Sequence, residues 1–391
     1  MRDKLRLSDL SILYVCLSDD WATTERRCLA DATYFRNIGG TSILLCHEKS
    51  IIDLEAEKES IPRIYFSQDL LKWRNKLNFY FQVQHILQKE QIDIIHSYNY
   101  ESLIPFGMIL KGMPQIPLIF TFNQNVEWRR TSFIDRLFVS RTDSIFTFSP
   151  NIKELAIESF PVNPRKVHVT GAGIDFPTKI KKTVHPEDKK KIVAFISRAS
   201  NDLDHIRLLV DAIPALLHQL SEMGLHQKLI FTFMTDVSWY NHPLYDPLKR
   251  MILERHLEMH ISFESKPLIC SSFQDCDIFM GVPQSELFTD YDLFALVTQT
   301  PVLLPRTSTR QLAIKQGKFG ETYHPDDGRE FRHKMLQIIS NYSKYLDELV
   351  GVEIELQDLH HFERYAEELY AHYEKLHVQR LRFSQKKKKL A

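Results

Sequence analysis

The chain has 391 residues, of which 43% are hydrophobic and 26% are charged, so it is long enough for two globular domains and too apolar for a disordered chain. Its 50 Lys and Arg residues balance its 50 Asp and Glu residues, which argues against a protein that binds nucleic acid over its whole surface. The five scattered cysteines, Cys16, Cys28, Cys46, Cys270 and Cys276, predict free thiols, a reducing cytoplasmic environment and no metal site.

The N-terminal residues have no apolar signal-peptide core, and no apolar run approaches the roughly 18–20 residues that a membrane span needs.

The first 176 residues predict one doubly wound α/β domain. Continuous apolar runs mark strands that are buried on both faces, and the capped or amphipathic segments between them mark helices. The expected strands are 11–17, 41–46, 92–95, 117–122, 144–148 and 167–169, and the expected helices are 25–37, 68–90 and 151–160. Strands that alternate with helices in this way indicate a parallel sheet.

Residues 177–190 are polar, charged and contain proline, which predicts a linker between two domains. A second sheet domain is expected over 191–356. Its expected strands are 191–197, 228–234, 260–263, 278–280 and 301–304, and its expected helices are 205–222, 247–256 and 327–342. A helix over 357–378 follows, and the basic residues 379–391 predict a disordered tail.

The segment from Asp275 to Pro301, DCDIFMGVPQSELFTDYDLFALVTQTP, contains a short strand, a loop, an acidic turn and an apolar helix. It resembles the donor-site motif of family 4 glycosyltransferases, in which a strand leads into E-G-F-G-L-P-x-x-E and a helix that ends in G-T-P-V. When the two are aligned on Thr300-Pro301-Val302, the first Glu of the family falls on Glu286 and its Phe on Phe288. Other stretches resemble the family as well, above all 149–175, which ends in Gly-Ile-Asp, and 361–376.

The resemblance implies the GT-B fold, an α/β architecture of two Rossmann-like, doubly wound parallel-sheet domains that face each other across a cleft. In that fold, 1–176 would be the acceptor-side domain and 191–356 the nucleotide-sugar domain. The helix 357–378 would cross back to the first domain.

The implied activity is transfer of a sugar from a nucleotide sugar, with retention of configuration and without a separate cofactor. In the family, an Arg directly after a buried strand grips the donor diphosphate, and Arg198 occupies that position. Glu286 would bind sugar hydroxyls, and the backbone N–H groups of Phe288, Thr289 and Asp290 would face the phosphates. The ordinary alternatives are a surface arginine at Arg198 and a helix-start acid at Glu286.

On the acceptor side, the resemblance points to His96, Asn123 and Glu25. His96 matches a histidine that the family has after a strand, and together with Glu286 and Arg198 it is a catalytic candidate. A lone histidine at a strand end can equally be structural. Asn123 stands where many relatives have a histidine, and it can donate and accept hydrogen bonds without carrying a proton. Glu25 belongs to a Glu-Arg pair that the family has at the start of its first helix.

Several family positions are changed in this chain. The two motif glycines fall on Leu287 and Thr289, the second Glu falls on Phe294, and the phosphate-binding Lys falls on Leu203 or Asp204. These changes leave open a non-catalytic GT-B protein that serves as a partner or regulatory subunit of an active transferase. A relative of the epimerases or phosphorylases with the same fold has no supporting motif here.

The expected partners of an active enzyme are a nucleotide-sugar donor and a glycan, a lipid-linked molecule or a protein as acceptor, but not nucleic acid. The basic tail suggests peripheral contact with anionic lipid at the inner face of the membrane. The segment Trp128-Arg129-Arg130, with Phe133 and Ile134, could add to that contact. A plain solvated chain end is the alternative for the tail.

Overall fold

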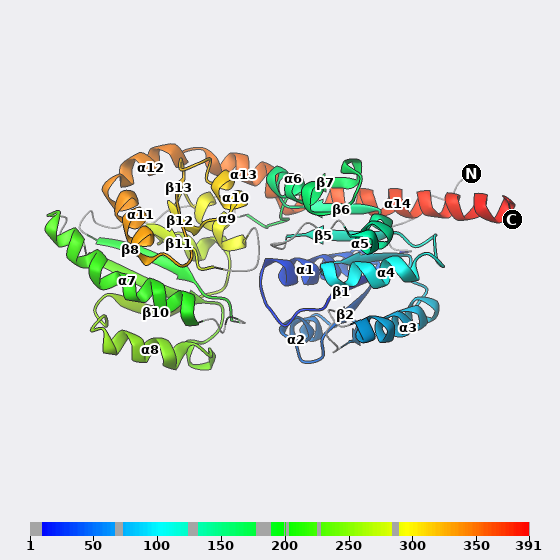
Figure 1. The fold of residues 1–391 in the computed structure, drawn as a ribbon, viewed down its shortest axis with the longest axis horizontal. Coiled ribbons are helices and arrows are strands. Elements are labelled where there is room, and N and C mark those ends of the chain that lie inside the picture. The colour runs from blue at the N-terminus through cyan, green and yellow to red at the C-terminus, as the bar shows by residue number, and fades with distance from the viewer. Residues whose placement is uncertain are drawn as a thin grey trace. The chain divides into compact units, whose positions relative to one another are not determined.

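The structure, a computed structural model, describes residues 10–66, 73–123, 132–176, 189–198, 200, 203–224, 228–283 and 289–390. The chain forms two compact units. The N-terminal unit contains Met1–Ile174 and His360–Ala391, and the C-terminal unit contains Asp175–Leu359. Each unit is built on one parallel sheet (Figure 1), so the predicted pair of Rossmann-like parallel-sheet domains is confirmed.

The sheet of the N-terminal unit has seven strands in the order β3-β2-β1-β4-β5-β6-β7. Every neighbouring pair is parallel, and the strand order reverses between β1 and β4. The strands are β1 (Ser11–Cys16), β2 (Thr41–Cys46), β3 (Arg63–Tyr65), β4 (Ile94–Ser97), β5 (Leu118–Phe122), β6 (Ser144–Thr147) and β7 (Val167–Val169). Their side chains are largely buried because helices cover both faces of the sheet.

The helices of this unit include the three that the sequence predicts. The α-helices are α1 (Thr23–Asn37), α2 (Ile51–Lys58), α3 (Trp73–Lys89), α4 (Leu103–Ile109), α5 (Phe133–Phe138) and α6 (Pro150–Ser159), with 3-10 turns η2 (Tyr100–Ser102), η3 (Val139–Arg141) and η4 (Pro164–Lys166). The elements α2, β3, α4 and α5 were not predicted from the sequence. Helix α4 has the sequence LIPFGMI, in which Pro105 and Gly107 are poor helix formers, and tertiary packing on α3 and α5 overrides that propensity.

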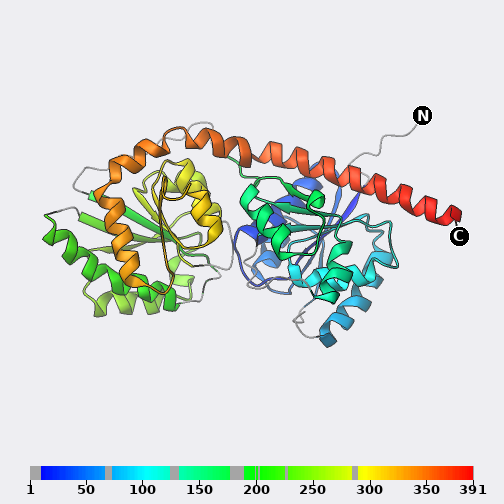
Figure 2. The same ribbon diagram turned by 45° about the horizontal axis from the view of Figure 1, so that its top comes forward.

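The closing helix α14 (Phe362–Leu390) belongs to the N-terminal unit. A short parallel bridge attaches its start to the end of the first segment: the Ile174 N–H donates to the His360 carbonyl at 2.7 Å, and the Phe362 N–H donates to the Ile174 carbonyl at 3.0 Å. The tail that was predicted to be disordered is helical to Leu390 (Figure 2), which corrects that prediction. Its Gln, Lys and Leu residues are good helix formers, and no Gly or Pro interrupts them.

The sheet of the C-terminal unit has six parallel strands in the order β10-β9-β8-β11-β12-β13, with the order reversing between β8 and β11. The strands are β8 (Lys189–Phe195), β9 (Lys228–Thr235), β10 (Ile261–Ser265), β11 (Ile278–Met280), β12 (Val302–Pro305) and β13 (Gly320–Tyr323). The predicted linker falls mostly on residues outside the described ranges, and its last two residues are the first of β8.

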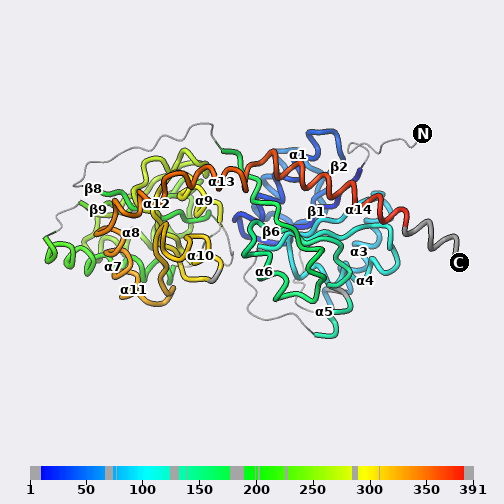
Figure 3. The backbone as a smooth tube through the Cα atoms, turned by 90° about the horizontal axis from the view of Figure 1, so that it is seen from above, coloured from blue at the N-terminus to red at the C-terminus, as the bar shows by residue number. Residues whose placement is uncertain are grey.

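Helices surround this second sheet, as the tube in Figure 3 traces. They are α7 (Leu203–Glu222), α8 (Tyr245–Glu254), α9 (Asp290–Val297), α10 (Ser308–Ala313), α11 (Gly328–Ser340), α12 (Tyr342–Leu349) and α13 (Val352–His360), with 3-10 turns η5 (Trp239–Asn241) and η6 (Cys270–Phe273). The elements β13, α10, α12 and α13 were not predicted from the sequence. All five cysteines are buried and free, as predicted. No helix within the described ranges is both long enough and apolar enough to span a bilayer.

Candidate functional site

The candidate donor site lies at the carboxyl ends of the strands in the C-terminal unit, where the strand order reverses. Ligands of open α/β sheets bind in this position. Arg198 follows β8 and Asp236 follows the neighbouring strand β9, and their side chains form an ion pair with 3.8 Å between Arg198 Nε and Asp236 Oδ2. Both side chains are mostly buried, with 18% and 15% exposed. The predicted cation is therefore at the strand edge, next to an acid that the sequence analysis did not identify.

His242 supports the turn that carries Arg198. Its Nδ1 accepts a hydrogen bond from the Leu244 N–H at 3.2 Å, so its Nε2 carries the proton and donates to the Ser197 carbonyl at 3.0 Å. Burial lowers the pKa of His242, which favours this neutral form. The polar residues that follow β9 were the only sequence signal that could have pointed to Asp236 and His242.

The N-terminus of α9 lies after β11, on the other side of the strand reversal. Thr289 is the N-cap, and its buried hydroxyl accepts a hydrogen bond from the Asp292 N–H at 3.3 Å. This cap places the N–H groups of the first turn, including Asp290, at the carboxyl edge of the sheet. N–H groups in such a turn bind anions readily. Glu286 and Phe288, the other predicted donor residues, lie outside the described residues.

A buried ion pair neutralises one acid in that first turn. The Nε atom of Arg310, in α10, donates to Asp292 Oδ2 at 3.2 Å, and the two side chains are only 3% and 7% exposed. Helix α10 is itself capped by Thr307, whose hydroxyl accepts from the Arg310 N–H at 3.1 Å. A negative charge next to a phosphate site would repel the ligand, and the Arg310 guanidinium offsets the charge of Asp292.

Phe294 occupies the position at which relatives have a second Glu. Its ring is 5% exposed and lies 5.7 Å from the ring of Phe273. One turn earlier, Tyr291 stacks on Phe195 of β8 with 4.7 Å between ring centroids. These aromatic contacts fix α9 against the sheet. The position thus contributes packing to the core and no hydrogen bond to a ligand.

The predicted acceptor-side residues lie in the N-terminal unit, and the structure gives Glu25 a structural role. It is the third residue of α1 and is 5% exposed. Its Oε2 accepts a hydrogen bond from the Ala22 N–H at 2.9 Å, which closes the start of the helix as in a capping box. Burial raises the pKa of its carboxyl group. Glu25 therefore closes the start of α1, and its acceptor-side role stays a prediction.

His96 is likewise a core residue. It is fully buried at the end of β4, its Nδ1 lies 2.6 Å from the Tyr373 hydroxyl, and its Nε2 lies 2.7 Å from Thr121 Oγ1. Burial lowers its pKa to about 3, so the ring is neutral at physiological pH. Both ring nitrogens are engaged inside the unit, and the catalytic or acceptor-side role of His96 stays a prediction.

Asn123 is also fully buried, directly after β5. The chain that follows it, 124–131, lies outside the described residues, so the acceptor role of Asn123 stays a prediction.

A buried polar network attaches α14 to the rest of the N-terminal unit. Arg27 and Asp31 of α1 form an ion pair of 2.9 Å, with 5% and 1% of their side chains exposed. The Tyr365 hydroxyl of α14 donates to Asp31 at 2.6 Å, and the Tyr98 hydroxyl donates to the same carboxylate oxygen. Arg27 also donates to the Gly173 carbonyl and lies over the Tyr365 ring. This network was not apparent from the sequence.

Comparison with known proteins identifies the chain's relatives. The model of glycosyltransferase family 4 matches residues 25–176, which make up most of the N-terminal unit. No curated protein matches the chain.

Solved structures match nearly the whole chain. A glycosyltransferase from Rickettsia africae ESF-5 is 16% identical with a TM-score of 0.70, and the match covers 94% of this chain and 98% of that one. HepE from Anabaena, in complex with UDP, is 14% identical with a TM-score of 0.67 and coverage of 93% and 99%. Sucrose-phosphate synthase from Thermosynechococcus elongatus is 13% identical with a TM-score of 0.65 and coverage of 95% and 100%. At these identities the matches establish a shared fold.

Proposed function

Because the chain is of the glycosyltransferase family 4 type over its N-terminal unit and has the GT-B fold throughout, we propose that it transfers a sugar from a nucleotide-sugar donor to an acceptor. We further propose that the transfer retains the configuration of the sugar and needs no cofactor. The observation that supports the proposal is the position of two groups at the carboxyl ends of the strands. Arg198 lies on one side of the strand reversal, and the capped first turn of α9 lies on the other. The complex of HepE with UDP supports a nucleoside diphosphate as the ligand.

In this reaction the protein must stabilise the charge that develops on the departing diphosphate. Arg198 would supply a positive charge, and the N–H groups at Thr289 and Asp290 would supply hydrogen-bond donors at a helix N-terminus. The Asp236 carboxylate and the His242 ring would hold Arg198 at the strand edge before the ligand arrives. Such preorganisation lowers the cost of reorganising charges during the reaction.

Glu286 remains our proposed ligand for the hydroxyls of the transferred sugar. It is four residues ahead of the start of α9. Asn123 remains the proposed acceptor-side residue, and the acceptor is a hydroxyl-bearing glycan, lipid-linked molecule or protein.

Nucleotide binding by the full chain tests this proposal most directly. A thermal-shift screen would compare UDP, GDP, ADP and CMP, since a ligand at ~100 times its dissociation constant stabilises the folded state by ~2.7 kcal/mol. For the nucleoside diphosphate that binds, Arg198→Ala should weaken affinity by about 10- to 100-fold, the value of one or two hydrogen bonds to a charged group. Affinity for the matching nucleoside should be unchanged, because Arg198 contacts only the phosphates.

Arg255→Ala is a suitable control, because this arginine pairs with Asp211 on the helices and not at the strand edge. If no nucleotide shifts the melting temperature, the donor site does not function. If Arg198→Ala weakens diphosphate and nucleoside equally, Arg198 does not bind phosphate. Glu286→Ala should abolish transfer with nearly unchanged nucleotide affinity, and an unaffected transfer rate would remove Glu286 from the site.

A further inference from the structure

A cavity of about 490 Å³ lies in the C-terminal unit between α7 and α11, two helices that pack against each other (Figure 1). Cavities that bind small molecules usually have volumes of about 300–1,000 Å³. Arg198, Asp236 and the first turn of α9 are not among the residues that line this cavity. It is therefore a second concave site, separate from the candidate donor site.

Helix α7 contributes charged and apolar residues to the cavity. Asp204, Arg207 and Asp211 line it together with Leu208 and Ala212. These positions are three or four residues apart, so they lie on one side of the helix. Ala212 belongs to the hydrophobic core of the unit, and Leu208 packs against that core. The cavity therefore has an apolar base and charged side chains around it.

Helix α11 contributes two arginines from its first turns, Arg329 and Arg332. Within the described part of the chain, the Nε atom of Arg332 is buried and has no hydrogen-bond partner. A buried donor without an acceptor destabilises the folded state, and such groups are uncommon in proteins. An anion in the cavity would supply the missing acceptor.

Two of the acidic residues that line the cavity are engaged by other groups. Asp327 caps α11, because its Oδ1 accepts hydrogen bonds from the Arg329 N–H at 2.9 Å and the Glu330 N–H at 3.0 Å. These hydrogen bonds lower the pKa of Asp327, so its carboxylate stays ionised and is committed to the helix end. Asp211 is bound by Arg255, which follows α8 and does not line this cavity.

Arg207 is the third cation of the cavity. Its side chain is 51% exposed, and its Nη1 lies 3.8 Å from Oδ1 of Asp204, which is 90% exposed. An ion pair that is this open to solvent is weak, so Arg207 can turn toward a ligand. The cavity is thus lined by three guanidinium groups, and the carboxylates beside them are committed to other groups or largely in solvent.

We propose that this cavity binds a phosphate group, either free in solution or carried by a small organic molecule, through Arg207, Arg329 and Arg332. Guanidinium groups bind phosphate in bidentate fashion and stay charged at every physiological pH. A phosphate group carries up to two negative charges and has three acceptor oxygens, so it can use several arginines at once. The inference is independent of the proposed transferase activity, in which the donor diphosphate is assigned to Arg198.

Calorimetric titration of the full-length Arg198→Ala chain tests the proposal, because this variant weakens the donor site and leaves the cavity unaltered. The probes are inorganic phosphate, pyrophosphate and ribose 5-phosphate, with ribose as the uncharged comparison. At least one phosphate-bearing probe should bind at millimolar concentration, and ribose should not. Tighter binding of ribose 5-phosphate than of inorganic phosphate would identify an organic phosphate as the occupant, and the reverse order would identify free phosphate.

Variants of the arginines should then weaken the binding. Arg329→Ala/Arg332→Ala, made in the same Arg198→Ala chain, should lower the affinity by about tenfold or more, because two groups that bond a charged ligand are lost. Arg332→Lys should lower it severalfold although the charge is kept, since an ammonium group cannot replace the two-pronged contact of a guanidinium. The melting temperature of each variant without ligand shows whether it is folded.

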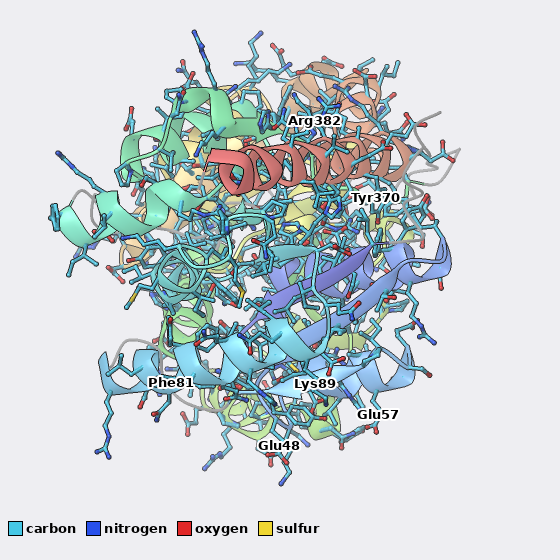
Figure 4. All side chains as sticks on the ribbon, turned by 90° about the vertical axis from the view of Figure 1, so that its right-hand side faces the viewer. Glu48, Glu57, Phe81, Lys89, Tyr370 and Arg382 are labelled. Carbon is cyan, nitrogen blue, oxygen red and sulfur yellow. The ribbon has the colours of Figure 1, made fainter. Side chains whose placement is uncertain are left out.

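The matched control is Arg74→Ala/Lys89→Ala, which removes two cations from α3 of the N-terminal unit, where Figure 4 labels Lys89. This control should bind the probes like the parent chain. The proposal fails if the control loses as much affinity as Arg329→Ala/Arg332→Ala. It also fails if the probes bind the unaltered chain and not the Arg198→Ala chain, or bind neither. In the first of these cases the phosphate belongs to the donor site, and the proposed function would stand.

Discussion

Breaking the buried pair between Asp292 and Arg310 should destabilise the C-terminal unit strongly. At 3.2 Å, two unit charges attract each other by about 5 kcal/mol for an effective dielectric constant of about 20. In Asp292→Leu the guanidinium of Arg310 stays buried without its partner, and losses of this kind cost about 3–5 kcal/mol. Amide hydrogen exchange reports on each unit separately. The slowest amides of β11 and β12 should exchange more than about 100-fold faster in this variant.

Two comparisons separate this explanation from a general loss of packing. In Asp292→Leu/Arg310→Met both charges are replaced by apolar side chains, so most of the stability should return. Asp204→Leu breaks an exposed pair, in which Asp204 is 90% exposed and 3.8 Å from Arg207, and it should change stability by about 1 kcal/mol or less. A stability loss in Asp292→Leu no larger than that in Asp204→Leu, or a double variant less stable than the single one, would show that the buried charge of Arg310 does not need its partner.

Two further predictions concern the N-terminal unit. The unfolded chain binds a proton on His96 near pH 6.5 while the folded unit excludes it until about pH 3, so stability should fall as the pH decreases from 6.5 toward 3. His96→Gln should reduce the proton uptake on acid unfolding by about one, measured from the pH dependence of denaturant unfolding, and an unchanged uptake would contradict the buried neutral ring. At Gly173, φ is +62° and an added Cβ would lie 2.5 Å from the Tyr365 ring and 2.6 Å from an Arg27 nitrogen. Gly173→Ala should therefore lower the melting temperature more than Gly224→Ala, where φ is +70° but no atom lies within 4 Å, and equal losses would mean that backbone strain alone matters.

The sequence predicted the fold because strand burial leaves a local pattern. Runs such as residues 12–16 and 192–195 are apolar along their length, and the alternation of strands with helices indicates parallel sheets without any knowledge of contacts. The elements that were missed are short or irregular, such as α4 with its internal Pro and Gly, and their structure depends on neighbours. The basic end of the chain was misread because charge suggested disorder, whereas its residues have good helix propensity.

Some residues of the candidate site could likewise be predicted from local sequence, and others could not. The sequence placed Arg198 at a strand end and Thr289 at a helix start, because both positions follow from neighbouring residues. Phe294, which stands where the family has its second Glu, packs in the core against Phe273. The partner of Arg198 lies 38 positions further along the chain, and nothing local marks Asp236 as that partner.

Tertiary structure alone decided the roles of the buried polar residues. His96 resembled a ligand-facing histidine, and the hydroxyl that it contacts belongs to Tyr373, 277 residues away. In the sequence Asp292 is only an acid in the first turn of a helix, and the structure shows that Arg310, 18 residues away, neutralises its charge. A buried charge or imidazole is stable only when a partner satisfies it, and that partner comes from whichever element the fold places alongside. The sequence therefore determined which segments are strands and helices and where the sheets present their carboxyl ends, while long-range packing determined which polar residues belong to the core.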